Sequence, residues 1–230
     1  MINLQEQIGL FRIIGSQLKG KIECIAIGGS AMMFYGAKNA TKDVDLVFSR
    51  KEELDAVKKI LYNSGFNERK NIKGIFRDEN AGKPVMMDGK DTRFDLFLNE
   101  VIGFRIHKGT IERIREIHNF GNLIVKTASP EDILMMKGCT ERERDRDDAA
   151  ELISRFNIDW NVVINEASQQ TKIGIAAFPL LIYDFLTELK ENYKADIPKN
   201  ITKELLAIAG KRIYELKKKG TLIKVKKYKK

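Results

Sequence analysis

Cysteine and histidine are scarce in this chain: its 230 residues hold two of each. Cys24 and Cys139 lie far apart in apolar or helical contexts, which favours two reduced, mostly buried thiols over a disulfide framework. Cysteine usage of this kind is typical of a cytoplasmic protein, which is the location we predict. With His107 and His118 as the only histidines, a zinc site has little support.

Long hydrophobic runs are also missing. No apolar stretch approaches the roughly 20 residues that a membrane span needs, and the first residues lack the basic and apolar regions of a signal peptide. We therefore expect no membrane partner. Hydrophobic residues make up 43% of the chain and charged residues 32%, as in ordinary globular proteins. The length suits one large domain or two small ones with a core of their own.

The net charge of +9 is confined to one end. Residues 211–230 hold ten lysines and arginines and a single acid, whereas the other 210 residues hold 31 basic and 31 acidic groups. The body of the chain is therefore not a uniformly basic nucleic-acid binder. Two interpretations of the tail stay open. It could contact RNA or DNA phosphates through counterion release, or it could be a solubilising end.

The first half of the chain has the pattern of an α/β fold. Residues 4–18 have helical apolar spacing. Strands are predicted at 22–27, 44–48, 66–76, 85–87, 93–98 and 123–125. Ser30 is expected to open a helix that Gly36 closes, and Ser49 to cap the next helix. Residues 99–121 are mixed and predict no element.

After residue 127 the pattern becomes helical. Pro130 followed by two acids is typical of a helix start. Helices are predicted at 130–138, 142–155, 159–170, 177–192 and 201–218. We therefore expect an α/β (α+β) fold with a mixed sheet and a C-terminal helical part. The predicted boundaries are 1–127 for the α/β core, 128–220 for the helical part and 221–230 for the basic tail.

A glycine turn follows the first predicted strand. Gly28 and Gly29 let the backbone approach a phosphate closely, and the next helix presents free N–H groups at its start. The Ser30 hydroxyl would add a donor. By itself, Gly-Gly-Ser is equally typical of a tight turn before a capped helix.

Two acids stand two residues apart in the second predicted strand. Asp43 and Asp45 should point to the same face of that strand, about 7 Å apart along the chain. Because Val44, Leu46 and Val47 predict a buried strand, two neighbouring carboxylates are costly there unless they bind a cation. The pair therefore predicts a divalent metal site, and a solvated edge strand is the alternative.

A third acid, Asp95, lies between apolar residues in the predicted strand 93–98. It could complete the metal site or deprotonate an attacking hydroxyl, and a salt bridge with Arg93 is the alternative. Lys38 and Lys42 flank the loop before the second strand and could meet phosphate. Solvated loop lysines are the interpretation that we favour for both.

Together, the glycine turn, the Asp43-x-Asp45 pair and Asp95 resemble the nucleotidyltransferase superfamily, which includes DNA polymerase β, antibiotic nucleotidyltransferases and toxins of the abortive-infection type. The resemblance covers about residues 20–100. It implies a mixed sheet flanked by helices, two Mg²⁺ held by three carboxylates, and a nucleoside triphosphate on the glycine turn. Asp43 and Asp45 would bind both ions, and Asp95 would share the ion that activates the acceptor hydroxyl.

A second stretch extends the resemblance to about residue 156. It carries polar residues after the Ser129-Pro130 helix start, namely Lys137, Arg142, Asp145 and Asp148. This pattern is similar to stand-alone nucleotidyltransferases of toxin–antitoxin and related bacterial and archaeal groups. It implies that Lys137 meets the nucleotide phosphates and that Asp145 or Asp148 orients Lys137 or the base–sugar end. The alternative is that residues 141–148 form a solvated, densely charged helix face.

The resemblance implies an enzyme. It would move a nucleoside monophosphate from a triphosphate to a hydroxyl acceptor in a reaction that depends on Mg²⁺, with release of pyrophosphate. The acceptor stays open among tRNA, a protein and a small molecule, and a toxin would also have an antitoxin or another protein partner. The alternative is a non-catalytic nucleotide- or RNA-binding regulatory module on the same fold.

Overall fold

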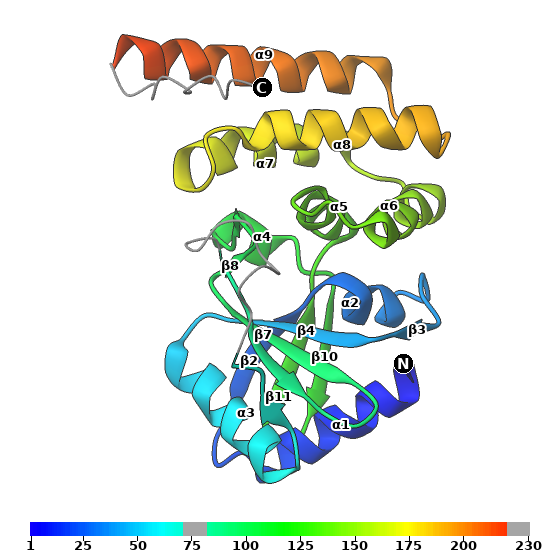
Figure 1. The fold of residues 1–230 in the computed structure, drawn as a ribbon, viewed down its shortest axis with the longest axis vertical. Coiled ribbons are helices and arrows are strands. Elements are labelled where there is room, and N and C mark those ends of the chain that lie inside the picture. Colours follow the sequence, from blue (N-terminus) through cyan, green and yellow to red (C-terminus); the bar gives the residue numbers. More distant parts are fainter. Residues whose placement is uncertain (71–81, 220–230) are drawn as a thin grey trace.

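A mixed β-sheet forms the centre of the computed structural model, which describes residues 1–70 and 82–219 (Figure 1). Within these residues the sheet has the strand order β10-β11-β2-β4-β7-β6-β5. Its strands are β2 (Ile22–Ala26), β4 (Asp43–Phe48), β5 (Asn67–Glu68), β6 (Val85–Asp88), β7 (Arg93–Leu98), β10 (Glu116–Phe120) and β11 (Leu123–Thr127). β4 lies antiparallel to β2 and parallel to β7. The predicted mixed-sheet α/β fold is confirmed.

Four helices accompany the strands in the first 127 residues, within the part that the structure describes: α1 (Leu4–Gln17), α2 (Gly28–Phe34), α3 (Lys51–Asn63) and α4 (Lys108–Glu112). α1, α2 and α3 lie against the same face of the sheet, where Phe11 of α1 packs on Phe120 and Phe34 of α2 stacks on His118, two residues of β10 that share that face (Figure 1). Two predicted boundaries are wrong. α2 begins at Gly28 rather than at Ser30, because Ile27 is already the extended residue before the helix. Arg50, not Ser49, precedes α3.

The region 99–121, which had no sequence pattern, consists of short elements. β8 (Glu100–Val101) and β9 (Phe104–Arg105) form a hairpin, and α4 and β10 follow it. A second small pair joins β1 (Ile2–Asn3) to β3 (Ala40–Thr41). Of the strand predicted at 66–76, β5 is the part that falls within the described residues up to residue 70, and 71–76 lie outside them.

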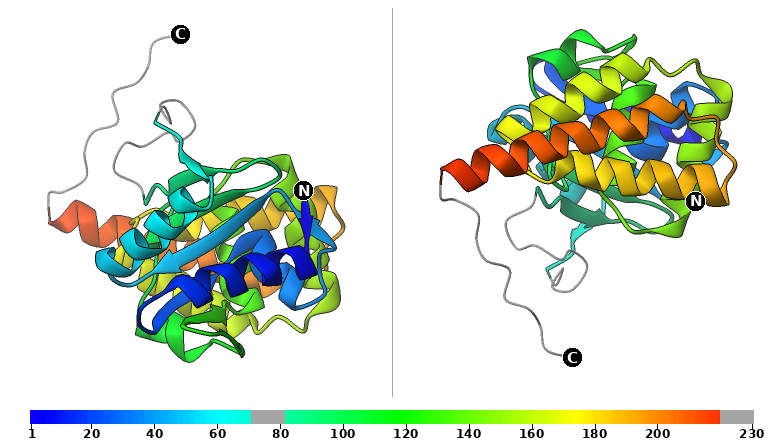
Figure 2. Two further views of the ribbon diagram at one scale, coloured as in Figure 1. Left: turned by 90° about the horizontal axis from the view of Figure 1, so that it is seen from below. Right: turned by 90° about the horizontal axis from the view of Figure 1, so that it is seen from above.

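The helical part lies beyond α2, at the end of the molecule away from α1 and α3 (Figure 1). Its helices match the predicted ones: α5 (Pro130–Gly138), α6 (Glu143–Arg155), α7 (Trp160–Ile173), α8 (Phe178–Asn192) and α9 (Lys199–Lys218). Seen along the stack, α9 crosses above α7 and α8 (Figure 2). None of the helices in the described ranges has the length and apolarity that crossing a membrane requires.

α5 is the central helix of this part. Each of its nine residues is buried, and the Ser129 hydroxyl caps it by accepting a hydrogen bond from the Asp132 N–H at 3.2 Å. One apolar cluster runs from the sheet through α5 to α8, and the rings of Phe104 and Phe178 lie 5.9 Å apart across the junction. α5 therefore carries its last-turn residue Lys137 to a fixed place above the sheet. The boundary at residue 127 stays a prediction.

Candidate active site

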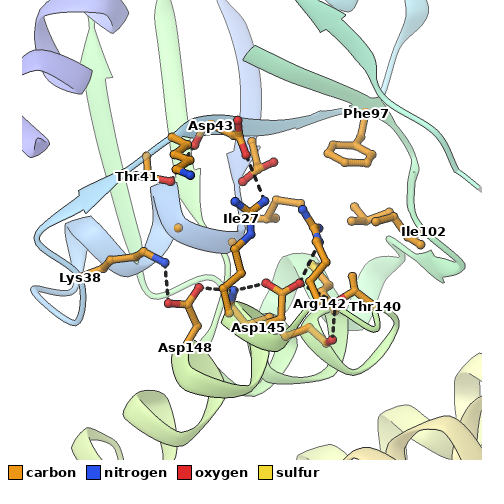
Figure 3. Close-up of a pocket in the computed structure, with 18 of the residues that line it drawn as sticks. Ile27, Lys38, Thr41, Asp43, Phe97, Ile102, Thr140, Arg142, Asp145 and Asp148 are labelled. Carbon is orange, nitrogen blue, oxygen red and sulfur yellow. Dashed lines mark hydrogen bonds and ion pairs between the residues drawn. The ribbon is translucent and has the colours of Figure 1, made fainter. Parts of the chain in front are cut away.

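A pocket of about 320 Å³ lies between the sheet and the helical part (Figure 3). This volume is within the range of small-ligand sites. Eight of the ten residues predicted for the site line it: Gly28, Gly29, Asp43, Asp45, Lys137, Arg142, Asp145 and Asp148. The first four come from α2 and β4, and the last four from α5, α6 and the link between them. The structure therefore brings together side chains that are about 100 residues apart in sequence.

Gly28 has a backbone conformation that other residues rarely adopt, with φ at +53°. A Cβ atom at this position would also lie 2.8 Å from Oδ2 of Asp45. A Cβ atom on Gly29 would lie 2.5 Å from the Thr41 hydroxyl oxygen. The two glycines thus let the turn lie directly against the carboxylate, so that the backbone and Asp45 face the same space.

We predict that Gly28→Ala displaces Asp45 and impairs ligand binding in the pocket. The matched control is Gly36→Ala, because Gly36 also has a positive φ (+68°) but a Cβ atom there would meet no neighbouring atom within 4 Å. Each variant should lose about 1 kcal/mol of stability from left-handed strain. Denaturant titration should show similar losses, whereas calorimetry should show weaker Mg–nucleotide binding for Gly28→Ala alone. Equal binding by the two variants would contradict this account of the turn.

Ser30 lies behind the turn and is fully buried. Its hydroxyl oxygen accepts a hydrogen bond from the Asp45 backbone N–H at 3.1 Å, and its carbonyl accepts one from the Gln7 amide at 3.3 Å. The pocket lining includes Gly28 and Gly29 but not Ser30. In this arrangement Ser30 positions Asp45, and its predicted direct contact with phosphate stays a prediction.

The predicted third acid, Asp95, is adjacent to the other two. β4 and β7 are parallel neighbours in a register that pairs Asp43 with Arg93 and Asp45 with Asp95, so these four side chains share one face of the sheet. The Arg93 guanidinium binds both oxygens of Asp95, at 2.6 and 2.8 Å, and Oδ1 of Asp43 at 3.0 Å. The Asp95–Arg93 salt bridge, left open from sequence, is therefore present.

Burial and the neighbouring acids make the carboxylates of Asp45 and Asp95 costly to ionise. Burial raises the pKa of Asp45 well above its usual range, and the neighbouring Asp95 and Asp43 raise it further. Burial also raises the pKa of Asp95, although the Arg93 guanidinium opposes that effect. A cation between the acids would remove the repulsion.

The donor set suits a hard divalent cation, since Mg²⁺ prefers carboxylate oxygens. Asp43 and Asp45 line the pocket and can supply two such ligands. As they stand, no three acidic, histidine or cysteine side chains of the described residues are grouped so as to hold a metal ion. Both oxygens of Asp95 are bound by Arg93, so Asp95 can become a ligand only if that guanidinium moves.

Lys137 lies on the side of the pocket that the helical part forms, across from Asp43 and Asp45. It is only 5% exposed, and its Nζ donates to Asp145 at 2.9 Å and to Asp148 at 2.6 Å. Arg142 and the Thr140 hydroxyl also bind Asp145, at 3.1 and 2.5 Å. Burial alone would raise the pKa of Asp145, but Lys137 and Arg142 together lower it. A charged network therefore fixes the ammonium group in the pocket.

Lys38 was predicted to be a solvated loop lysine, and that interpretation is wrong. Its Nζ lies 2.5 Å from Oδ1 of Asp148, its side chain is 25% exposed, and it lines the pocket (Figure 3). Arg144 likewise reaches from α6 to Asp43, at 3.4 Å. The charged run 141–148 is thus not simply a solvated face, because Asp145 and Asp148 point inward while Arg144 spans the pocket.

Sequence reasoning also missed the apolar side of the pocket, which is formed by Phe97, Val101, Ile102 and Met136. One signal was available. Phe97 is two residues after Asp95 in β7 and therefore lies on the same face as the acids. Ile102 follows the strand in a hairpin turn and Met136 lies on α5, so neither gave such a signal.

The chain matches a family model described as "Nucleotidyltransferase of unknown function (DUF6036)" over residues 2–194. No curated protein matches it. Among solved structures, a candidate nucleotidyltransferase from H. pylori aligns at 16% identity and a TM-score of 0.42, covering 93% of this chain and 95% of that one. ANT(2")-Ia in complex with adenylyl-2"-tobramycin aligns at 15% identity and a TM-score of 0.40, covering 80% of this chain and 98% of that one. An antigenic nucleotidyltransferase-like protein from Paracoccidioides brasiliensis aligns at 18% identity and a TM-score of 0.43, covering 85% of this chain and 94% of that one.

Proposed function

The chain belongs to this family of nucleotidyltransferases, and from that premise we propose that its pocket binds a nucleoside triphosphate with Mg²⁺ and transfers the nucleoside monophosphate to a hydroxyl acceptor. The observation that carries the proposal is the close contact between the glycine turn and Asp45, with Lys137 fixed on the opposite side of the pocket. A glycine turn, paired carboxylates and a positioned ammonium group suit a metal-bound polyphosphate.

Asp43 and Asp45 would hold two Mg²⁺, and Asp95 would share one of them once Arg93 has moved. When bound, such ions stabilise the attacking and leaving oxygens of an in-line displacement. Ser30 and the sheet register hold Asp45 and Asp43 in place for this role.

The phosphates would lie between the glycine turn and Lys137. The backbone at Gly28 and Gly29 would approach the β and γ phosphates, because neither residue has a side chain to prevent it. Lys137 would neutralise the charge that develops on the leaving pyrophosphate. Asp145 and Asp148 would orient Lys137, and Asp148 would also hold Lys38 at the same end of the pocket.

The test is incubation of the protein and Mg²⁺ with each α-labelled triphosphate and a cell extract. We expect one class of acceptor to become labelled and pyrophosphate to be released, both abolished by EDTA. The alternative, a non-catalytic nucleotide-binding module, predicts calorimetric binding of the triphosphate without labelling. Absence of both binding and labelling would refute the proposal.

For the acceptor we propose RNA, and the feature that favours it is the basic end of the chain, where residues 211–230 carry a net charge of +9. A toxin role with an antitoxin partner and a cytoplasmic location remain predictions from sequence. α9, which contains residues 211–218 of this basic end, lies at the far end of the molecule from the sheet (Figure 1).

Deleting residues 220–230 should weaken RNA binding and flatten its salt dependence. The segment carries five lysines, so the slope of log K against log salt should fall by up to about 3.5 for single-stranded RNA. A full-length variant with those five lysines changed to glutamine should behave like the deletion, because the effect depends on charge. Filter binding at several salt concentrations measures the slope, and an unchanged slope would remove RNA as the proposed acceptor.

A further inference from the structure

The pocket has two chemically different ends. Lys38 and Asp148 lie at the charged end, and Phe97 and Ile102 lie on the side away from them (Figure 3). Val101 and Met136 complete the apolar side. The proposed phosphate and metal groups account for the charged end only.

Ile102, which lines the apolar side of the pocket, has an unusual backbone conformation. It and Gly103 form the two-residue connection of the β8–β9 hairpin, with φ values of +48° and +91°. Positive φ at both positions is typical of a type I′ turn, in which asparagine, aspartate or glycine is the usual first residue. A β-branched residue in this conformation is an outlier, and such outliers cluster at functional sites.

The surroundings hold the hairpin in this conformation. The Ile102 N–H donates to the Gly82 carbonyl at 3.1 Å. The fully buried Gln170 side chain of α7 binds both backbone groups of Arg105, accepting from its N–H at 3.0 Å and donating to its carbonyl at 2.8 Å. At Gly103, a Cβ atom would lie 2.3 Å from Cδ1 of Ile175. The strained turn is therefore rigid, and Ile102 is presented to the pocket from a fixed position.

We propose that Ile102 is a specificity-determining residue that contacts the nucleobase of the bound triphosphate; this inference rests on the proposed function. Phe97 is 3% exposed and backs the contact, whereas Ile102 is only partly buried and presents surface to the pocket. A nucleoside triphosphate has one charged end and one flat aromatic end, which match the two ends of the pocket. The larger ring surface of a purine should bind better than a pyrimidine.

The four side chains of the apolar side carry no strong hydrogen-bonding group. Recognition through them depends on shape and apolar contact rather than on base edges. ATP and GTP should therefore bind with affinities within a few-fold of each other, and both should bind more tightly than inorganic tripolyphosphate. The difference between ATP and tripolyphosphate measures what the nucleoside contributes.

Ile102→Gly and Ile102→Asn test the proposal, because both residues tolerate positive φ and leave the hairpin in place. Calorimetry with Mg–ATP and Mg–tripolyphosphate should show an approximately tenfold loss of ATP affinity in each variant. Tripolyphosphate affinity should not change. The control is Asn99→Gly: Asn99 also has a positive φ (+58°) beside the hairpin but does not line the pocket, so both affinities should stay as in the wild type.

The ratio of the ATP affinity to the tripolyphosphate affinity distinguishes a failure of the proposed function from a failure of the Ile102 assignment. A wild type that binds neither probe would refute the proposed function itself. A wild type that prefers ATP, with the same preference in both Ile102 variants, would overturn the assignment of Ile102 and leave the proposed function intact. Because the ratio is taken within one variant, a loss of folded protein affects both probes equally and does not imitate the expected result.

Discussion

Asp45→Asn is expected to lower the rate of nucleotidyl transfer at least about 1000-fold. Asp45 lies against the glycine turn, beside Asp43 and across from Asp95, so an asparagine there removes a charged metal ligand while keeping the shape of the side chain. Both the attacking and the leaving oxygen lose stabilisation if a metal is lost. Steady-state kinetics on the labelled acceptor measures the effect.

The same substitution should make the metal-free protein more stable at neutral pH. The pKa of Asp45 is raised in the folded chain, chiefly by burial and then by Asp95 and Asp43. An acid with a raised folded-state pKa costs stability when it ionises, and wild-type stability should fall as pH rises from the unfolded pKa of about 4 towards the folded value. Asparagine removes that loss. Denaturant titrations with EDTA at several pH values would show a stability difference between Asp45→Asn and the wild type that grows as the pH rises.

Asp88→Asn is the matched control. Asp88 ends β6, next to β7, and pairs with Arg69 at 2.7 Å on the outside of the molecule. The control should keep the wild-type rate, since Asp88 does not line the pocket. If Asp45→Asn transfers nucleotide as fast as Asp88→Asn, Asp45 is not a metal ligand.

Lys137→Ala should lower kcat/KM by about 100- to 1000-fold, because a fixed cation near a leaving pyrophosphate acts in a water-poor site. It should also destabilise the protein by about 3 kcal/mol, since Asp145 and Asp148 would keep their charges without the buried ammonium group between them. Kinetics and denaturant titration measure the two effects separately.

The triple variant Lys137→Ala, Asp145→Asn, Asp148→Asn should regain much of the lost stability without regaining activity. Lys126→Ala is a surface control: Lys126 pairs with the exposed Glu23 at 2.6 Å on the sheet, where such a pair contributes little. Full activity of Lys137→Ala would show that the ammonium group serves the fold alone.

Much of this architecture could be predicted from sequence because it depends on local patterns. Short stretches of sequence are enough to recognise these elements: β2, β4 and β7 by their apolar runs, and the start of α5 by its proline. The shared face of Asp43 and Asp45 follows from the two-residue period of a strand. The placement of the two acids on one face was therefore predictable as soon as the strand was.

The features that were missed depend on distant contacts. Lys38 looked solvated because its partner, Asp148, is 110 residues away on a helix that folds over the loop. The hydrogen bond from the Asp45 backbone to the Ser30 hydroxyl was not predicted, because it depends on the packing of α2 against β4. Ile102 lies in a strained hairpin that Gln170, 65 residues beyond Arg105, holds in place. No local propensity indicates such a turn at an isoleucine.

The most direct test of the account is calorimetric titration of a nucleoside triphosphate into the wild type and into the double variant Asp43→Asn, Asp45→Asn, each with Mg²⁺ and with EDTA. We predict that the wild type binds the triphosphate with Mg²⁺ and loses at least about tenfold in affinity with EDTA, because the ions link the carboxylates to the phosphates. The double variant should bind weakly and without dependence on Mg²⁺. Undiminished Mg²⁺-dependent binding by the double variant would contradict the central claim that these two acids form the metal–nucleotide site.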